Sequence, residues 1–120
     1  MKKILIAEDD PPSRELILEV LGEWGYQVVE ATDGRDALQK IEETEPDLAV
    51  LDIQMPGLDG LAVVRRLREN PRFARLRVMA LTAYAMRGDR EKALEAGFDA
   101  YFTKPVDVTA LRAAIRELLG

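Results

Sequence analysis

Carboxylate side chains follow two short apolar segments of this sequence. Glu8, Asp9 and Asp10 come directly after the first segment, and Asp52 follows the apolar run 48–51. Taken singly, each could form a turn or cap a helix, and capping suits Asp10 in particular. A helix cap needs one carboxylate, whereas three stand together here. Like charges this close raise one another's pKa unless a cation lies between them, and a few carboxylate oxygens suit Mg²⁺. If the two segments are neighbours, these residues predict a magnesium site.

A hydroxyl and an ammonium group end two later segments. Thr82 closes the segment 76–82, where a threonine by itself says little about function. Lys104 precedes Pro105, and an isolated Lys-Pro pair is most often a surface lysine before a turn, with a peptide bond that can be cis. A cation is nevertheless needed near a group of carboxylates. The acidic loop lacks the glycine-rich backbone of flavin and nucleotide sites, which argues against phosphate binding without a metal.

Composition limits the classes of function. The 120 residues contain no Cys and no His, so disulfides, the usual zinc sites and an imidazole catalyst are excluded. The formal net charge of −5 argues against a surface that binds nucleic acid. The apolar segments are no longer than strands and no signal peptide precedes the first, so we expect no membrane span. These features predict one cytoplasmic globular domain over residues 1–120.

Strand-like and helix-like segments alternate along the chain. We expect strands at 3–7, 26–30, 48–51, 76–82 and 100–102, and helices at 11–24, 34–43, 58–69, 89–96 and 108–119. The unbroken apolar run at 48–51 is typical of a strand buried on both faces. The fold class is therefore α/β, and for this size we expect a flavodoxin-like doubly wound (βα)5 domain with a five-stranded parallel sheet of strand order 2-1-3-4-5. The carboxyl ends of the first and third strands then flank one crevice, where the carboxylates meet.

The first and fourth predicted helices differ in apolar content. The helix at 11–24 is expected to face the core through Leu16, Val20, Leu21 and Trp24. The helix at 89–96 has few large apolar anchors, mainly Leu94 beside Ala93 and Ala96. A helix so weakly anchored should shift at the least cost.

Four motifs stand in order, each at the predicted carboxyl end of a strand. They are Glu8-Asp9, the stretch from Leu51 to Gly60 (LDIQMPGLDG), Leu81-Thr82-Ala83, and Tyr101-Phe102-Thr103-Lys104-Pro105. Each is weak alone, but the full set is a specific match that covers Lys3 to Leu119. The chain resembles the receiver domain of two-component response regulators, of the single-domain chemotaxis-regulator (CheY-like) type.

The resemblance implies a site for phosphoryl transfer. Asp52 would be the nucleophile that takes a phosphoryl group from a phosphohistidine on a sensor histidine kinase or a histidine phosphotransfer protein. Asp9 and Asp52, with the main-chain carbonyl of Gln54, would hold Mg²⁺, and Glu8 would act largely through a bound water. Lys104 would pair with Asp52 and then with a phosphoryl oxygen.

The resemblance also implies a switch. Thr82 would hydrogen-bond the phosphoryl group and draw the end of its strand towards it, and Tyr101 would turn inward. Alternatively, Tyr101 and Phe102 are ordinary strand aromatics, one on each face of the sheet. The change should appear on the face formed by the fourth helix, the fifth strand and the last helix. Gln54 and Tyr84 stand where the family tunes access of water to the phosphoryl group, and their bulk predicts moderated hydrolysis.

Three other classes of function would each require a different set of residues from a signalling switch. A constitutive binding module would not need the complete set of acidic, hydroxyl and lysine residues. A phosphatase with an aspartyl nucleophile would want a second acid two residues further on, where this chain has Gln54. A transcription factor would need an output domain after Gly120. The segment 83–89 also resembles receivers of hybrid kinases and of cell-cycle regulators. We expect a switch, not an enzyme, with an unidentified protein as its downstream target.

Overall fold

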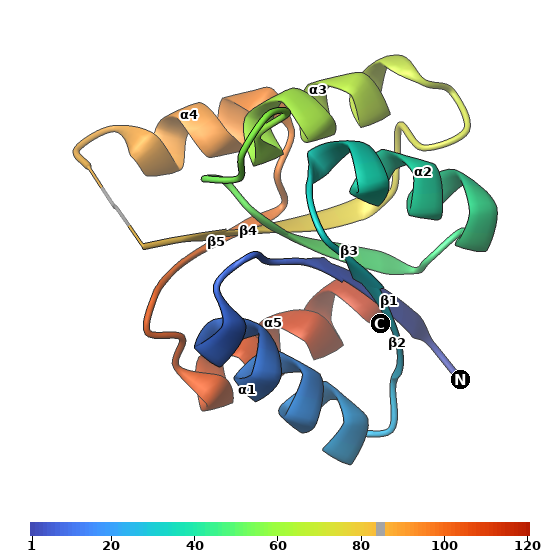
Figure 1. Cartoon of the computed structure of the whole chain (residues 1–120), viewed down its shortest axis with the longest axis vertical. Helices are drawn as coiled ribbons and strands as arrows, with labels where there is room; N and C mark the ends of the chain where they lie inside the picture. Colours follow the sequence, from blue (N-terminus) through green and yellow to red (C-terminus); the bar gives the residue numbers. More distant parts are fainter. Residues whose placement is uncertain (84–85) are drawn as a thin grey trace.

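Five parallel strands form one sheet, in the order β2-β1-β3-β4-β5, within the part of the chain that the structure describes, residues 1–83 and 86–120 (Figure 1). The structure is a computed structural model. The strands are β1 (Lys3–Ala7), β2 (Gln27–Ala31), β3 (Leu48–Asp52), β4 (Arg77–Thr82) and β5 (Ala100–Thr103). The helices are α1 (Pro11–Glu23), α2 (Gly34–Thr44), α3 (Gly60–Glu69), α4 (Asp89–Ala96) and α5 (Val108–Leu119). The predicted fold class and strand order are confirmed.

Helices cover both faces of the sheet (Figure 1). Helices α2, α3 and α4 lie on one face, and α1 and α5 lie on the other. Because side chains alternate along a strand, Leu5 of β1 faces the first layer and Ile4 faces the second. All five residues of β3 are buried. This burial explains the unbroken apolar run at 48–51, since a central strand with helices on both sides has no polar face.

The predicted boundaries agree with the observed ones to within two residues. The bounds of β1, α4 and α5 are as predicted, whereas α3 begins at Gly60 instead of residue 58. The side chain of Asp59 caps this helix, because it accepts a hydrogen bond of 2.9 Å from the N–H of Ala62. Gly60 packs against the end of β3, where a Cβ atom would come within 2.6 Å of the Asp52 carbonyl oxygen. The cap and this close approach set the start of α3.

Two of the predicted core positions are wrong. Leu16 is 41% exposed, and its neighbour Ile17 is buried in its place. On α4, Leu94 is 41% exposed and Ala93 is the buried residue. In both helices adjacent apolar residues compete for the sheet, so contact with the sheet and not the helix's own pattern decides its rotation. Helix α4 is therefore anchored by a smaller side chain than predicted.

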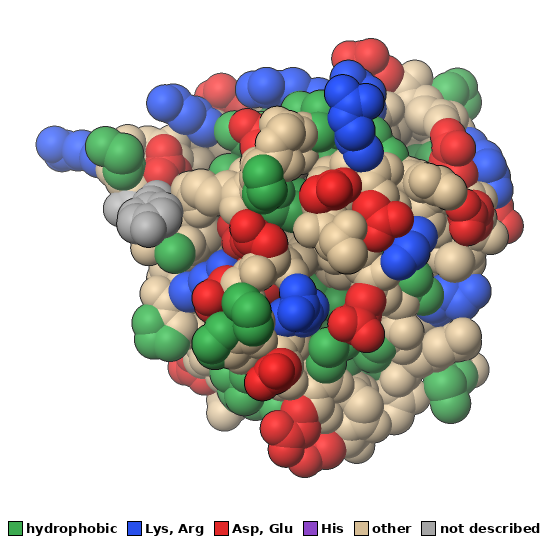
Figure 2. Space-filling model, viewed as in Figure 1, with side chains coloured by type: hydrophobic (Ala, Val, Ile, Leu, Met, Phe, Trp, Pro, Cys, Tyr) green, Lys and Arg blue, Asp and Glu red, His purple; other side chains and the backbone are tan. Residues whose placement is uncertain are grey.

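The surface mixes charges of both signs. Acidic and basic side chains are interspersed over the face of the molecule seen in Figure 2, with small apolar patches between them. Across residues 1–83 and 86–120, every helix is too short or too polar to cross a membrane.

Candidate functional site

The carboxyl edge of the sheet, where the strands end, collects the residues that the sequence analysis singled out. Glu8 and Asp9 follow β1, Asp52 ends β3, Thr82 ends β4 and Lys104 follows β5. The carboxylate oxygens of Glu8, Asp9 and Asp52, here called the acidic cluster, lie within 4.8 Å of one another. A cavity of about 320 Å³ opens beside them. Its lining residues are Asp9, Asp10, Asp52, Gln54, Ala83 and Lys104.

Main-chain hydrogen bonds extend the sheet past the strand ends and position the site. The N–H of Ile53 donates to the carbonyl of Leu81 at 2.8 Å, just beyond β3. The N–H of Lys104 donates to the carbonyl of Thr82 at 2.8 Å, just beyond β5. Asp52 and Lys104 therefore stand on backbone that is still hydrogen-bonded to β4, and their side chains meet at the same edge.

Asp52 is buried and both of its carboxylate oxygens have partners. Asp52 is only 3% exposed. The Nζ atom of Lys104 lies 2.8 Å from Oδ2, and the N–H of Gln54 donates to Oδ1 at 2.9 Å. The structure thus brings the predicted phosphoacceptor and the predicted lysine into direct contact.

Glu8 is fully buried beside the same ammonium group. Lys104 forms ion pairs with both Glu8 and Asp52, so its single charge faces two buried carboxylates. Burial, followed by the neighbouring Asp52 carboxyl, raises the pKa of Glu8 to about 8, although Lys104 acts in the opposite direction. Burial alone lowers the pKa of Lys104, but contacts with Asp52 and Glu8 outweigh it and raise that pKa. The lysine keeps its charge and the Glu8 carboxyl tends to hold its proton, because one ammonium group does not fully compensate two buried carboxylates.

The acidic cluster fits a divalent cation. All of its ligand atoms are carboxylate oxygens. Among the described residues, Oε2 of Glu8 is buried and has no hydrogen-bond partner. Such an oxygen is costly unless a cation or a water compensates it. Mg²⁺ binds in proteins through one or two carboxylates and keeps several waters, which matches a cluster open to a cavity. The residues present therefore suit the magnesium ion predicted from the sequence.

Thr82 contacts the loop that follows β3. It is only 1% exposed, and its Oγ1 donates a hydrogen bond of 2.6 Å to Oε1 of Gln54. This contact was not predicted, because the sequence pointed to Gln54 only through its main-chain carbonyl and through access of water. The two residues are 28 positions apart, and no local pattern links them. Tyr84, the second residue predicted to affect water access, lies outside the described residues.

Tyr101 and Phe102 lie on opposite faces of the sheet, as predicted for strand aromatics. Tyr101 packs against the layer of α2, α3 and α4, and Phe102 packs against the layer of α1 and α5. The Tyr101 hydroxyl is buried and has no hydrogen-bond partner in the described part of the chain. Burial raises the pKa of this phenol, and the charge of Asp89 adds to the effect. The Tyr101 hydroxyl is thus a polar group that the surrounding described residues leave unsatisfied.

Asp10 caps α1, as predicted. Its Oδ2 accepts hydrogen bonds from the Ser13 hydroxyl at 2.8 Å and from the Ser13 N–H at 3.4 Å. Asp10 lines the cavity but is not part of the acidic cluster. The Lys104-Pro105 peptide bond, a candidate for the cis form in the sequence, is cis.

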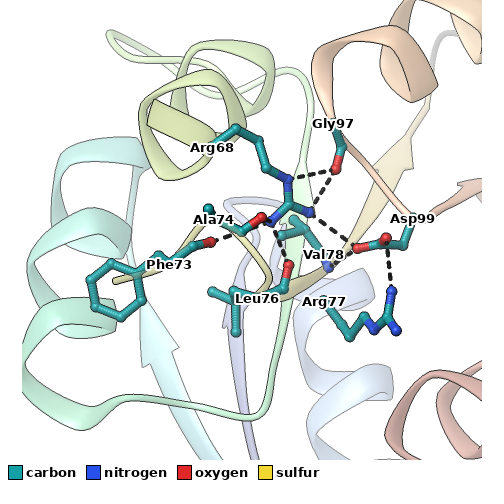
Figure 3. A network of polar contacts seen from close by, with 8 residues as sticks. All are labelled: Arg68, Phe73, Ala74, Leu76, Arg77, Val78, Gly97 and Asp99. Carbon is teal, nitrogen blue, oxygen red and sulfur yellow. Dashed lines mark hydrogen bonds and ion pairs between the residues drawn. The ribbon is translucent and has the colours of Figure 1, made fainter. Parts of the chain in front are cut away.

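A second polar network, here called the Arg68 cluster, lies at the amino edge of the sheet, where the strands begin (Figure 3). The guanidinium of Arg68 donates to the Asp99 carboxylate and to the carbonyls of Phe73, Ala74, Leu76 and Gly97. Asp99 also accepts a hydrogen bond of 2.9 Å from the N–H of Val78. No sequence pattern separates Arg68 from Arg65 and Arg66 on the same helix, so this cluster was not predicted.

Comparison with known families identifies the domain. Residues 4–116 match the model of the response regulator receiver domain. The chain belongs to this family. The resemblance drawn from the four motifs is confirmed, and this receiver is a component of two-component signalling, for which a histidine kinase is the general partner.

Similar proteins include regulators and kinase receivers. The polar-differentiation response regulator DivK of Brucella anthropi is 34% identical to this receiver, over 99% of this chain and 97% of the relative. The signal receiver domain of a signal transduction histidine kinase from Syntrophus aciditrophicus is 35% identical, with a TM-score of 0.91, over 99% of this chain and 90% of that chain. The receiver domain of a Pseudomonas aeruginosa sensor histidine kinase is 34% identical, with a TM-score of 0.91, over 99% and 98% of the two chains. That structure has a magnesium ion coordinated in its active site cleft.

Proposed function

We propose that Asp52 accepts a phosphoryl group from the phosphohistidine of a sensor histidine kinase or a histidine phosphotransfer protein. One observation carries the proposal: the buried Asp52 carboxylate contacts Lys104 at 2.8 Å and borders an acidic cavity. In the transfer, a carboxylate oxygen bonds to phosphorus as the bond between phosphorus and the histidine nitrogen breaks, and that nitrogen keeps the electron pair.

Mg²⁺ is the cofactor of this proposal. Asp9, Asp52 and the main-chain carbonyl of Gln54 would hold the ion, and Glu8 would act largely through a bound water. When bound, Mg²⁺ supplies positive charge that neutralises the phosphoryl oxygens. The grouping of three carboxylate side chains, with a buried Glu8 oxygen that has no hydrogen bond among the described residues, supports this assignment, as does the magnesium ion in the cleft of the Pseudomonas aeruginosa receiver.

The chain's own residues orient the phosphoryl group and transmit its presence. The ammonium of Lys104 offsets the charge of roughly −1.5 to −2 that a phosphoryl group brings. The Thr82 hydroxyl donates to a phosphoryl oxygen and draws the end of β4 towards it, and Tyr101 follows. Helix α4 responds because its buried anchor is the small Ala93. Coupling of ~1–3 kcal/mol is enough to alter the α4-β5-α5 face that a downstream protein would bind.

The proposed role is that of a switch and not of an enzyme with a diffusible substrate. The protein would promote only its own phosphorylation and dephosphorylation. In support, the residue two positions after Asp52 is Gln54, so the second acid of an aspartyl phosphatase is missing there. The proposal places the chain in the cytoplasm, where kinases have access to ATP.

Intact mass after incubation with acetyl phosphate tests the proposal. The wild type should gain one phosphoryl group with Mg²⁺ present and none when the metal is chelated, whereas Asp52→Asn should gain none in either condition. Asp59→Asn is the matched control, since asparagine also caps a helix and Asp59 is outside the site. A folded wild type that stays unmodified with several phosphoryl donors would contradict the proposal and favour a constitutive binding module.

A further inference from the structure

Gln54 makes two hydrogen bonds that connect the phosphoacceptor to the switch threonine. Its main-chain N–H donates to Oδ1 of Asp52 at 2.9 Å, and its side-chain Oε1 accepts from Oγ1 of Thr82 at 2.6 Å. The strands that end in Asp52 and Thr82 are paired neighbours in the sheet. One residue of the β3–α3 loop therefore contacts both groups on which the proposed switch depends.

We propose that Gln54 is a positioning residue that restrains Thr82 in the unphosphorylated chain. The inference rests on the proposed phosphoryl transfer and adds a competing contact to it: the Thr82 hydroxyl must leave Gln54 before it binds the phosphoryl group. The Gln54 side chain thereby lowers the affinity of the site for a phosphoryl group and determines how readily the switch responds.

Competition follows from the chemistry of a hydroxyl group, which has one proton to donate. While the Thr82 hydroxyl donates to the Gln54 amide oxygen, it cannot donate to a phosphoryl oxygen. The charged phosphoryl oxygen is the stronger acceptor, so the exchange is favourable after phosphorylation. Gln54 is exposed, and water can bind its amide once the contact is broken. The contact therefore reduces the gain from phosphorylation without preventing the change.

The size of the effect follows from the net strength of a neutral hydrogen bond, which corresponds to a factor of about two to ten in an equilibrium constant. A binding-competent state that is populated only in part weakens the apparent affinity by that fraction. Removing the amide oxygen of Gln54 should therefore tighten binding of a phosphoryl analogue by about twofold to tenfold.

The test measures the dissociation constant of beryllium fluoride, a phosphoryl analogue, for the whole chain at saturating Mg²⁺ by NMR titration. The proteins are the wild type, Gln54→Met, Thr82→Val and the double variant. Methionine keeps the length of the side chain and the main-chain contacts of Gln54 but has no amide oxygen. Gln27→Met is the matched control, because Gln27 is an exposed residue at the start of β2, far from the carboxyl edge.

We expect Gln54→Met to bind beryllium fluoride about twofold to tenfold more tightly than the wild type. In the Thr82→Val background the same substitution should have no effect, and Gln27→Met should match the wild type. An equal gain with and without the Thr82 hydroxyl would mean that Gln54 hinders the ligand directly, which overturns the inference. An unchanged or weakened affinity of Gln54→Met overturns it too. If Thr82→Val does not fold, Thr82→Ala takes its place in the same comparison.

Failure of the proposed function has a different signature. A wild type that neither binds beryllium fluoride nor takes a phosphoryl group from acetyl phosphate contradicts phosphoryl transfer itself. A wild type that does both, while Gln54→Met behaves like it, contradicts only the restraint on Thr82.

Discussion

At the amino edge of the sheet, the guanidinium of Arg68 has a hydrogen-bond acceptor for each of its donor nitrogens. At the carboxyl edge, the single positive charge of Lys104 faces two buried carboxyl groups. Arg68 donates to four carbonyls and to Asp99, with distances between 2.6 and 3.3 Å (Figure 3). Lys104 is shared by Glu8 and Asp52, and an oxygen of Glu8 is buried without a hydrogen bond in the part of the chain described. The polar groups of the first edge satisfy one another, whereas the second edge keeps an unsatisfied carboxylate oxygen at the site proposed to bind a cation and a phosphoryl group.

Helix α4 follows the carboxyl end of β4 and ends at the Arg68 cluster. Its C-terminal end is held by Arg68, which binds the carbonyl of Gly97 at 2.7 and 3.0 Å. Gly97 has a φ of +123°, and a Cβ atom there would come within 2.7 Å of the Arg68 side chain. Its N-terminal cap, Gly88, makes no side-chain capping bond. A change at Thr82 should therefore move the N-terminal end of α4 more than its C-terminal end.

The largest effect is expected from breaking the amino edge. Arg68→Met keeps the length of the side chain and removes every donor, which leaves four carbonyls and Asp99 without this partner. We expect a loss of about 2–4 kcal/mol in the free energy of unfolding, measured by urea denaturation. The control Arg65→Met changes an exposed arginine of the same helix and should stay within about 0.5 kcal/mol of the wild type. Equal losses from the two variants would mean that the Arg68 cluster adds no stability of its own.

The opposite result is expected at the carboxyl edge, where replacing Glu8 by an uncharged residue should increase the free energy of unfolding as the pH rises. The pKa of Glu8 is raised to about 8 in the folded protein, against 4.5 ordinarily. The folded chain holds this proton to a higher pH than the unfolded chain, so wild-type stability falls as pH rises from 4.5 to about 8. Glu8→Gln has no proton to release at this position, so its stability does not fall for this reason. Without Mg²⁺, its stability relative to the wild type should increase over that range by more than about 1 kcal/mol.

Urea denaturation at several pH values, in a buffer with a chelator, measures this difference. Glu19→Gln, which removes an exposed carboxylate from α1, is the control for a change in surface charge. A stability difference between Glu8→Gln and the wild type that does not vary with pH would show that Lys104 fully compensates Glu8.

The smallest effect is expected from adding the missing cation. Millimolar Mg²⁺ should raise the melting temperature of the wild type by about 2–5 °C, because a ligand that binds only the folded state stabilises it. Asp9→Asn should lose this response, while Asp59→Asn, which leaves the acidic cluster intact, should keep it. Differential scanning fluorimetry with and without the metal measures this change in melting temperature. A response retained in Asp9→Asn would place the cation elsewhere.

The site could be predicted from sequence to the extent that it depends on strand ends. The run 48–51 places Asp52 at the end of a buried strand, and parallel strands all end at one edge. Helix rotation could not be predicted in the same way. Leu16 and Ile17 are both apolar, and only contact with the sheet decides which of them is buried.

Local patterns and the order of the motifs were enough to predict the family, the order of the strands and the set of residues at the carboxyl edge. Which side chains share a hydrogen bond or an acceptor depends instead on the folded chain. Gln54 and Thr82 are 28 residues apart, and Arg68 and Gly97 are 29 apart. Such contacts depend on strand pairing and on side-chain direction, and both arise only when the chain has folded.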